Sequence, residues 1–458
     1  MSTVADVNSQ YYNDSCDPTF SFHHYNWSGM PPNETYEYQT HLIADCRCGG
    51  NRQPPGIGGL WICQRPSEVP MGVSFGSGPS ARVLPNSSLL GGTLDVESRT
   101  LYVGVEWQDA FYEDQGAIMA VDIDSGDRTI VSGQWMDPAD GYTTYGESDP
   151  TEKTYWTDNI IGAPPYKNPL GRVYDIELGS DGYLYAMAPD KDLQTHIVRV
   201  DIATGDRKVM WTEKRTLDPN NQNDPAHIQC DNGSLLPGTR TWVQLNQEAG
   251  FELDPNGDYL LPVIQNGTVD DITPNGIIRV AKDGSACTWV TRFGMGEDNG
   301  FWGQTIGAGP LSQFSFDAVY WHEGQIYATS ATSITFKIDP TTGKRSIVSS
   351  DGVGNGPLLG LDWMDWDEGR QLMWSGGTGA GTSIVSWNMT SNIRFGHIGL
   401  KLAKATDFQT ASGPLDTCCG THRPGWVDPL NGQLVMIHNV YGIVRFEPES
   451  GNSVILSL

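Results

Sequence analysis

The chain has 458 residues, with 28 Lys and Arg against 55 Asp and Glu and a formal net charge of −27. This charge repels phosphate backbones and anionic lipid surfaces, and no apolar run is long enough to span a membrane, so we expect no nucleic-acid partner and no membrane span. With 54 Gly, 28 Pro, 15 Trp and 18% charged residues, the composition favours short strands and tight turns over helices.

The first 84 residues form a predicted cysteine-rich extension, which precedes one large domain at 85–458. An even cysteine count favours disulfide bonds and an oxidising compartment. We expect bridges from the extension to the Cys418–Cys419 pair and a bridge between Cys230 and Cys287, although the sequence leaves the connectivity open. The eight cysteines are Cys16, Cys46, Cys48, Cys63, Cys230, Cys287, Cys418 and Cys419.

Export to the medium or the cell surface is the expected localisation, with a signal that is not part of this chain. The start Met1-Ser-Thr-Val-Ala-Asp lacks the basic and apolar regions of a secretory signal. Seven Asn-x-Ser/Thr sequons fit the surface loops of a secreted glycoprotein. They lie at Asn13, Asn26, Asn33, Asn86, Asn232, Asn266 and Asn388.

An Asp-x-x-[Ser/Thr]-Gly-x-Arg tail recurs along the large domain. It occurs at 120–128, 199–207 and 337–345, with degenerate copies at 279–284 and 445–451. Each copy predicts a strand, a tight turn and another strand. Self-similarity at a period of tens of residues indicates an array of equivalent structural units.

Reading backward from each tail to an alternating apolar strand yields six units of four short strands. They span about 89–131, 173–211, 241–294, 312–350, 358–405 and 422–458. Antiparallel sheets with two partly buried faces pack radially, which leaves only short, protected edges. We therefore predict an all-β fold, a six-bladed β-propeller of four-stranded antiparallel blades.

These units resemble the blades of NHL-type and senescence-marker/gluconolactonase-type six-bladed propellers, whose tails are similar to V-D-P-x-T-G-x-R. The resemblance covers about 85–458 and implies the fold, which proteins of many functions share. A gluconolactonase-type metal site would need a glutamate on the first inner strand, where Gly91 and Gly92 stand. The resemblance therefore does not extend to the hydrolysis of sugar lactones.

A Gly-x-Gly-Pro element precedes three of the units, at Gly76–Pro79, Gly307–Pro310 and Gly354–Pro357. We interpret it as a turn that aims the chain into the next inner strand, because it recurs per blade and lacks the Lys-Ser/Thr of a phosphate-binding loop. A backbone cradle for an anion is the alternative.

Three aspartates, Asp175, Asp317 and Asp362, occupy nearly the same place on their predicted inner strands. Inner strands line the axial channel, and carboxylates from several blades at one height suit a hard cation such as calcium. The alternative is structural, with each carboxylate accepting backbone hydrogen bonds between blades.

Four outer-to-inner connections, at 134–171, 215–241, 295–311 and 405–421, are long enough to mark a binding face. Aromatic residues in them are candidates for stacking on sugar rings, or for forming a small core of the loops themselves. The candidate ligand-binding residues are Trp135, Tyr155, Trp156, Trp302, Arg423 and His438.

Histidines near the predicted channel mouth are the candidates for proton transfer, namely His422 and His227, and His438 is predicted in the loop between the middle strands of the sixth unit. We therefore expect an exported propeller that binds a glycan or small polar molecule on its loop-rich face, with calcium in the channel. A metal-assisted hydrolase or lyase is one alternative. A structural protein that self-assembles at a surface is the other.

Overall fold

The computed structural model describes the blades of one domain and several shorter segments. They are residues 45–46, 63–64, 76–78, 87–108, 114–133, 170, 172–189, 195–215, 228–229, 242–245, 250–266, 275–292, 306–310, 316–330, 333–359, 362–377, 383–399, 422–438 and 442–457. All regular elements in these ranges are β-strands. No helix in them is long and apolar enough to cross a membrane.

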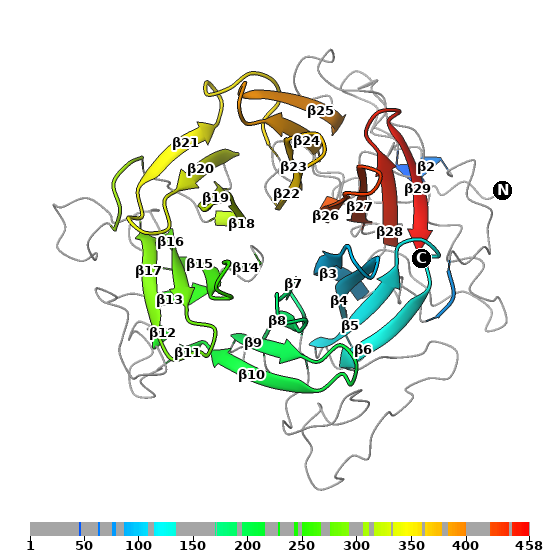
Figure 1. Cartoon of the computed structure of the whole chain (residues 1–458), viewed down its shortest axis with the longest axis horizontal. Helices are drawn as coiled ribbons and strands as arrows, with labels where there is room; N and C mark the ends of the chain where they lie inside the picture. The colour runs from blue at the N-terminus through cyan, green and yellow to red at the C-terminus, as the bar shows by residue number, and fades with distance from the viewer. Residues whose placement is uncertain are drawn as a thin grey trace, which may run out of the picture.

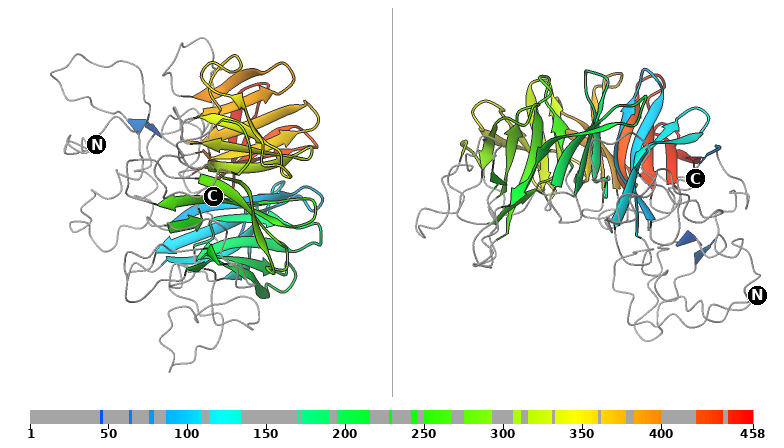
Figure 2. Two further views of the ribbon diagram at one scale, coloured as in Figure 1. Left: turned by 90° about the vertical axis from the view of Figure 1, so that its left-hand side faces the viewer. Right: turned by 90° about the horizontal axis from the view of Figure 1, so that it is seen from below.

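Six antiparallel sheets stand around a central axis, in chain order, so that the last sheet lies beside the first (Figure 1). Seen from the side, the sheets form a thick disc (Figure 2). Each sheet runs from an inner strand at the axis to an outer strand at the rim. The predicted six-bladed propeller is therefore confirmed.

The first three blades are built from the following strands. Blade 1 contains β3 (Ser87–Asp95), β4 (Thr100–Gln108), β5 (Asp114–Asp122) and β6 (Arg128–Gly133). Blade 2 contains β7 (Asp175–Leu178), β8 (Leu184–Pro189), β9 (Thr195–Val200) and β10 (Arg207–Thr212). Blade 3 contains β13 (Trp242–Leu245), β14 (Glu252–Leu253), β15 (Tyr259–Asn266), β16 (Asn275–Val280) and β17 (Cys287–Arg292).

The last three blades follow the same order. Blade 4 contains β18 (Phe316–His322), β19 (Gln325–Ser330), β20 (Ile334–Ile338) and β21 (Arg345–Ser349). Blade 5 contains β22 (Trp363–Asp367), β23 (Leu372–Gly377), β24 (Ser383–Asn388) and β25 (Ile393–Gly399). Blade 6 contains β26 (His422–Asp428), β27 (Gln433–His438), β28 (Gly442–Glu447) and β29 (Asn452–Ser457).

Blade 3 departs from four strands because its inner edge is divided. Both β13 and β14 pair with β15, with Trp242 opposite Asn266 and Leu253 opposite Tyr259. Two short pairs lie outside the six blades. They are β1 (Asp45–Cys46) with β2 (Cys63–Gln64), and β11 (Lys214–Arg215) with β12 (Ile228–Gln229).

The repeated tail forms the turn between the third and fourth strands of a blade. In blade 1, Asp122 Oδ1 accepts hydrogen bonds from the N–H groups of Asp124 and Ser125, at 2.9 and 2.8 Å. Gly126 then takes a left-handed conformation with φ of 78°, which glycine adopts without steric cost. The same aspartate turns occur in blades 2 and 4, at Asp201 and Asp339.

The arginine of the tail donates a hydrogen bond to a hydroxyl group of the preceding blade, a contact that we call the clasp. In blade 2, the buried Arg207 donates from Nη1 to Ser132 Oγ of blade 1 at 2.8 Å, and that hydroxyl donates to the Gly205 carbonyl at 2.7 Å. Equivalent bonds join Arg345 to Thr291 and Arg394 to Ser349, at 2.5 and 2.6 Å. A charged donor in a buried site needs such partners, so the clasp holds neighbouring blades in one register.

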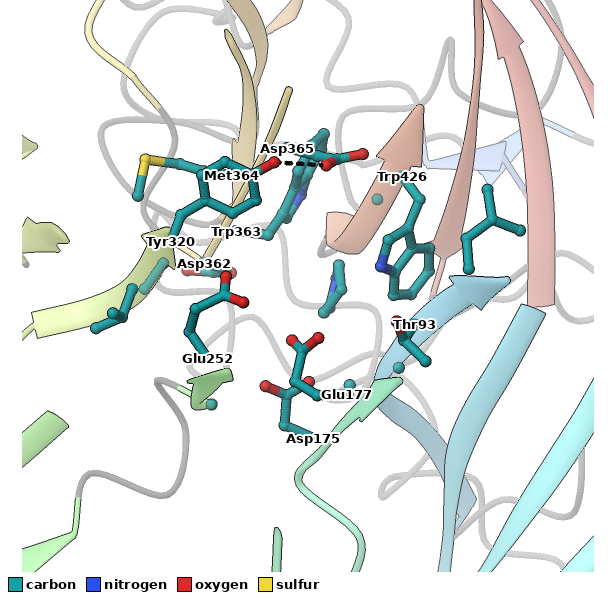
Figure 3. A pocket seen from close by; sticks show the side chains of 18 of the residues that line it. Thr93, Asp175, Glu177, Glu252, Tyr320, Asp362, Trp363, Met364, Asp365 and Trp426 are labelled. Carbon is teal, nitrogen blue, oxygen red and sulfur yellow. Dashed lines mark hydrogen bonds between the residues drawn. The ribbon is translucent and has the colours of Figure 1, made fainter. Parts of the chain in front are cut away.

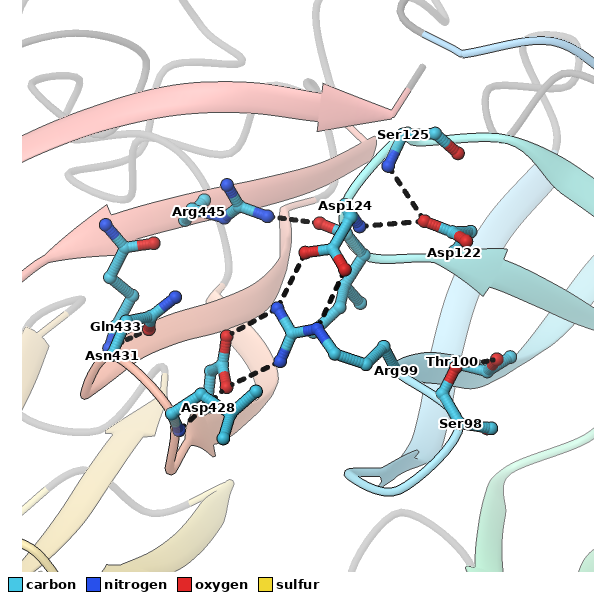
Figure 4. Close-up of polar contacts among 12 residues, drawn as sticks. Ser98, Arg99, Thr100, Asp122, Asp124, Ser125, Asp428, Asn431, Gln433 and Arg445 are labelled. Atoms are coloured by element: carbon cyan, nitrogen blue, oxygen red, sulfur yellow. Dashed lines mark hydrogen bonds and ion pairs between the residues drawn. The ribbon is translucent and has the colours of Figure 1, made fainter.

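Blade 6 supplies all four of its own strands. The same kind of arginine-to-hydroxyl hydrogen bond therefore joins it to blade 1 and closes the ring. Arg128 Nη1 of blade 1 donates to Ser457 Oγ of blade 6 at 2.6 Å, and Ser457 donates to the Gly126 carbonyl at 2.7 Å. Arg445 also donates to the Ile123 carbonyl across this junction (Figure 4). The expected disulfide ties to the Cys418–Cys419 loop lie outside the described residues.

The Gly-x-Gly-Pro elements pack on the tail of the blade that they precede. The Arg345 N–H donates to the Ala308 carbonyl at 2.7 Å. A Cβ on Gly307 would lie 1.9 Å from the Gly343 carbonyl oxygen, so only glycine allows this approach. The same contact joins Ser77 to Arg128 and Asn355 to Arg394. The element therefore secures the entering chain against the outer turn of its blade.

Six apolar clusters fill the six interfaces between neighbouring blades. The cluster at the ring junction, for example, joins Leu101 and Val121 of blade 1 to Val435 and Leu456 of blade 6. The other clusters join blades 1 and 2, 2 and 3, 3 and 4, 4 and 5, and 5 and 6. Burying each large aliphatic side chain contributes about 1.5–3 kcal/mol, so the blades are held mainly by these contacts.

Candidate functional site

A cavity of about 910 Å³ lies at the axis, lined by the inner strands of all six blades. Its charged lining residues are seven acids and one base. The acids come from blades 2 to 5, and the base, Arg172, lies just before β7. The seven acids are Asp175, Glu177, Glu252, Asp317, Asp362, Asp365 and Glu368.

One lining residue of each blade belongs to a ring of equivalent positions. The position is defined by strand pairing. In blade 2, for example, the ring residue Glu177 lies opposite Tyr185 of the second strand, and Tyr185 directly follows the fully buried Leu184. The ring residue of every other blade has the same relation to its second strand. The ring consists of Thr93, Glu177, Glu252, Tyr320, Asp365 and Trp426. Three carboxylates, a phenol, a hydroxyl and an indole therefore face the axis (Figure 3).

Hydrogen bonds to the next blade orient the ring carboxylates. Glu252 Oε2 accepts from the Trp321 N–H of blade 4 at 3.2 Å. Asp365 Oδ2 accepts from the Val427 N–H of blade 6 at 2.6 Å, and its Oδ1 accepts from the Tyr320 hydroxyl at 3.2 Å. Two of the three ring carboxylates, those of Glu252 and Asp365, are thus held in fixed directions around the cavity (Figure 3).

All three aspartates expected as metal ligands line this cavity. Asp175 is the first residue of β7, Asp317 lies at the bulge of β18, and Asp362 directly precedes β22. Asp175 Oδ2 accepts from the Phe251 N–H of blade 3 at 3.0 Å, which is the structural role considered as the alternative. Within the described ranges, no group of three or more His, Cys, Asp or Glu is arranged to hold a metal ion.

Burial raises the pKa of several cavity carboxyl groups toward neutrality. It raises the pKa of Asp175 to about 7, that of Glu252 to about 8 and that of Asp365 to about 6. The pKa of Glu177 is also well above its ordinary value, because of burial and then of the nearby charges of Glu252, Asp175 and Asp365. Near pH 7 the group therefore retains protons that a bound cation would displace.

Arg172, the basic lining residue, forms an ion pair with the buried Glu106 of blade 1. Its Nε lies 3.0 Å from Glu106 Oε2, and its guanidinium lies over the Tyr174 ring at 5.1 Å. The positive charge of Arg172 is therefore balanced by Glu106, which is not one of the seven acids that line the cavity. The cavity therefore keeps its excess of acidic groups.

Among the other predicted binding and proton-transfer residues, His438 has a described side chain, and it does not line this cavity. His438 was expected in a loop, but it is the last residue of β27, buried and opposite His422 in the strand register. The backbone of Arg423 also lies in β26. Outside the described residues lie His227, Trp135, Tyr155, Trp156, Trp302, Cys16, Cys48, Cys230, Cys418 and Cys419.

Sequence reasoning missed Glu177, Glu252 and Asp365, although a signal was present. Each stands two residues before the residue that opens the first turn of its blade, as Glu252 precedes Asp254 and Asp365 precedes Asp367. Counting back from the turns, rather than aligning the apolar pairs, finds the inner-strand position that faces the axis.

No protein-family model and no curated protein matches the sequence. Among solved structures, the chain is similar to a structural genomics protein of unknown function from Bacteroides thetaiotaomicron. The two share 11% identity over 81% of this chain and 74% of that chain, with a TM-score of 0.42. The assignment of the fold therefore rests on the strands and registers described above and not on this similarity.

Proposed function

We propose that this protein is an exported β-propeller that binds a small, positively charged ligand in its axial cavity. The observation that carries the proposal is the set of carboxylates from blades 2, 3 and 5 at equivalent ring positions, in a lining with seven acids and one arginine. Calcium, the cation expected from the sequence, and an organic cation are the two candidate ligands.

The electrostatics of the cavity favour a cation. Desolvated carboxylates repel one another and stay partly protonated, whereas a positive charge between them stabilises their ionised forms. Calcium binds six to eight oxygens at about 2.3–2.6 Å, which carboxylates and water can supply. The Tyr320 and Trp426 rings in the same lining suit an organic ammonium ion through cation–π attraction.

Calorimetric titration tests this proposal. Chelator-treated protein at pH 7 is titrated with calcium chloride and, separately, with 1,4-diaminobutane, in buffers of different ionisation enthalpy. We expect one of these cations to bind with release of protons, because Asp175 and Glu252 have pKa values of about 7 and about 8.

Variants locate the binding. Glu177→Gln and Glu252→Gln remove ring charge with little change of shape, and each should weaken cation binding by about tenfold or more. Glu97→Gln, an exposed change outside the cavity, serves as the matched control. Absence of binding by both cations, or equal binding by the ring variants and wild type, would contradict the proposal.

Export and disulfide bonding are proposed together. Cys287 is disulfide-bonded, and the backbone register sets Cys46 opposite Cys63. Bonded cysteines are typical of oxidising compartments. Peptide mapping without reduction should find no free thiol at these three positions, and free thiols there would contradict an exported protein.

A metal-assisted hydrolase or lyase is the second candidate, and one observation favours it. Asp175 and Asp365 have pKa values of about 7 and about 6, and the Tyr320 hydroxyl donates to Asp365, so these groups can exchange protons near neutral pH. A panel of esters, lactones and acidic glycans assayed with and without calcium tests it. Metal-dependent turnover that Asp365→Asn abolishes would establish the enzyme, and its absence across the panel would exclude it for those substrates.

A further inference from the structure

A second cavity, of about 430 Å³, lies between blades 4 and 5, away from the axis. Its lining includes the turn residues Gln371 and Asn392 of blade 5 and the aromatic residues Tyr327, Trp366 and Trp387. It opens beside the turns that join inner strands to second strands and third strands to fourth strands. Trp366 lines both cavities, but none of the six ring residues lines the second one.

The turns that border this cavity depart from the repeat. Gln371 is the last residue of its turn, with φ of 56°, where four other blades carry glycine. Asn392, with φ of 55°, ends the tail turn, where all five other blades carry glycine. The glycines are Gly182, Gly257, Gly324 and Gly432 in the first set and Gly126, Gly205, Gly284, Gly343 and Gly451 in the second.

A left-handed conformation costs a residue with a side chain about 1–2 kcal/mol relative to glycine, less for asparagine. In blade 1 that cost is offset, since Arg99 occupies the position of Gln371 and its side chain joins Asp124 and Asp428 at the ring junction. In blade 5 both side chains border the cavity, and each also makes a hydrogen bond: Gln371 Nε2 donates to the Glu368 carbonyl at 2.9 Å, and Asn392 Oδ1 accepts from Trp387 Nε1 at 2.9 Å. Strained residues that converge on one cavity are a sign of function.

Aromatic residues of the cavity also depart from the repeat. Trp387 replaces the smaller apolar residues of the other third strands, and its Nε1 donates to Asn392 Oδ1 at 2.9 Å. His322 stands where blades 1, 3, 5 and 6 have aspartate, and its ring lies 4.1 Å from that of Trp366. The third-strand counterparts of Trp387 are Val121, Val200, Val280, Ile338 and Phe446, and the aspartates are Asp95, Asp254, Asp367 and Asp428.

We propose that this cavity is a second binding site, which takes an uncharged sugar ring of a glycan. Aromatic faces pack against the C–H groups of a sugar, while the Gln371 and Asn392 amides can donate to and accept from its hydroxyls. The charged side chains of the lining, Glu323 and Lys337, are opposite in sign. Burial lowers the pKa of His322, so that ring is neutral at pH 7. Charge therefore favours neither anions nor cations, in contrast to the axial cavity.

Saturation-transfer NMR tests the site on the full chain, with the methyl glycosides of glucose, galactose, mannose and N-acetylglucosamine as probes. We expect at least one to bind with a Kd of about 1–10 mM, the range of a single sugar ring with a few hydrogen bonds. The double variant Gln371→Gly/Asn392→Gly installs the residues that the other blades carry. It relieves two left-handed conformations but removes the hydrogen bond that the buried Trp387 indole donates to Asn392, so Tm is measured in parallel, and it should weaken sugar binding about tenfold.

Glu177→Gln, which alters the axial cavity, should leave sugar binding unchanged and so separates this site from the proposed function. Trp387→Phe removes the indole and leaves Gln371 and Asn392 in place, and it should also weaken sugar binding. The proposal is overturned if none of the four glycosides shows saturation transfer at about 50 mM, a concentration above the whole expected range of Kd. It is also overturned if the double variant binds as wild type does.

Discussion

Arg99 of blade 1 and Asp428 of blade 6 form a two-pronged ion pair across the junction of the ring. Nη1 lies 2.9 Å from Oδ1 and Nη2 lies 2.9 Å from Oδ2 (Figure 4). The Asp428 side chain is 1% exposed, and Arg99 also pairs with Asp124 at 2.7 Å. Blade 6 thus meets blade 1 through a nearly buried carboxylate, and each of the two blades is made of four strands that are consecutive in the sequence.

Asp428→Asn should lower the free energy of unfolding by about 1–2 kcal/mol, because Arg99 loses its buried charged partner but keeps its ion pair with Asp124. Arg99→Gly removes the other partner and also relieves its φ of 58°. Urea unfolding of both single variants and the double variant measures the coupling between them. Additive effects would show that this pair does not stabilise the junction.

Ser457→Ala should destabilise the protein by about 1–3 kcal/mol, since the buried Arg128 loses a hydrogen-bond acceptor. Ser132→Ala is the matched change, at the same clasp between blades 1 and 2 with Arg207. Chemical unfolding of both variants compares the two losses of stability. Equal losses would show that the hydroxyl stabilises the junction of blades 6 and 1 as much as it stabilises the interface of blades 1 and 2. An unchanged Ser457→Ala protein would mean that the clasp does not contribute to closure.

Gly307→Ala should be far more destabilising than Gly324→Ala, although both glycines have positive φ, of 82° and 74°. A Cβ at position 324 meets nothing within 4 Å, so only the backbone cost of about 1 kcal/mol applies. At position 307 it would lie 1.9 Å from the Gly343 carbonyl oxygen, and the packed element must move. Thermal unfolding compares the two variants, and equal losses would contradict the packing role.

Stability of the chelator-treated protein should fall as pH rises from 5 to 8. The pKa of Glu252 is raised to about 8, so the folded state holds a proton that the unfolded state releases near pH 4.5. The resulting stabilisation is complete below pH 4.5 and is lost as pH rises through about 8. The raised pKa values of Asp175 and Asp365 act in the same direction at lower pH.

Glu252→Gln should therefore flatten this pH dependence and raise Tm at pH 8 by about 1–2 °C, which corresponds to roughly 1 kcal/mol for a domain of this size. At pH 5 the variant and the wild type should unfold at similar temperatures, because the wild-type side chain is protonated there. Scanning calorimetry at the two pH values, with Glu97→Gln as control, checks this. A wild-type Tm that is higher at pH 8 than at pH 5 would contradict the raised pKa values.

The six-bladed fold was predictable because its signals are local and repeated. Asp122 and Gly126 form their turn from a few consecutive residues, and the same pattern recurs in the other blades. Short-range hydrogen bonding and backbone sterics decide such a turn whatever surrounds it. The divided inner edge of blade 3 was not predictable, because β13 and β14 are joined only by their common pairing with β15.

The sequence by itself determined the repeat, its turns, the clasp arginines and the acidic charge of the chain. Only the tertiary structure decided that Asp175, Asp317 and Asp362 share a cavity with Glu177 and Glu252. These residues come from blades separated by tens of residues, and their approach depends on strand register, since a shift of one residue turns a side chain to the other face. The burial that raises their pKa values exists only once all six blades have closed around the axis.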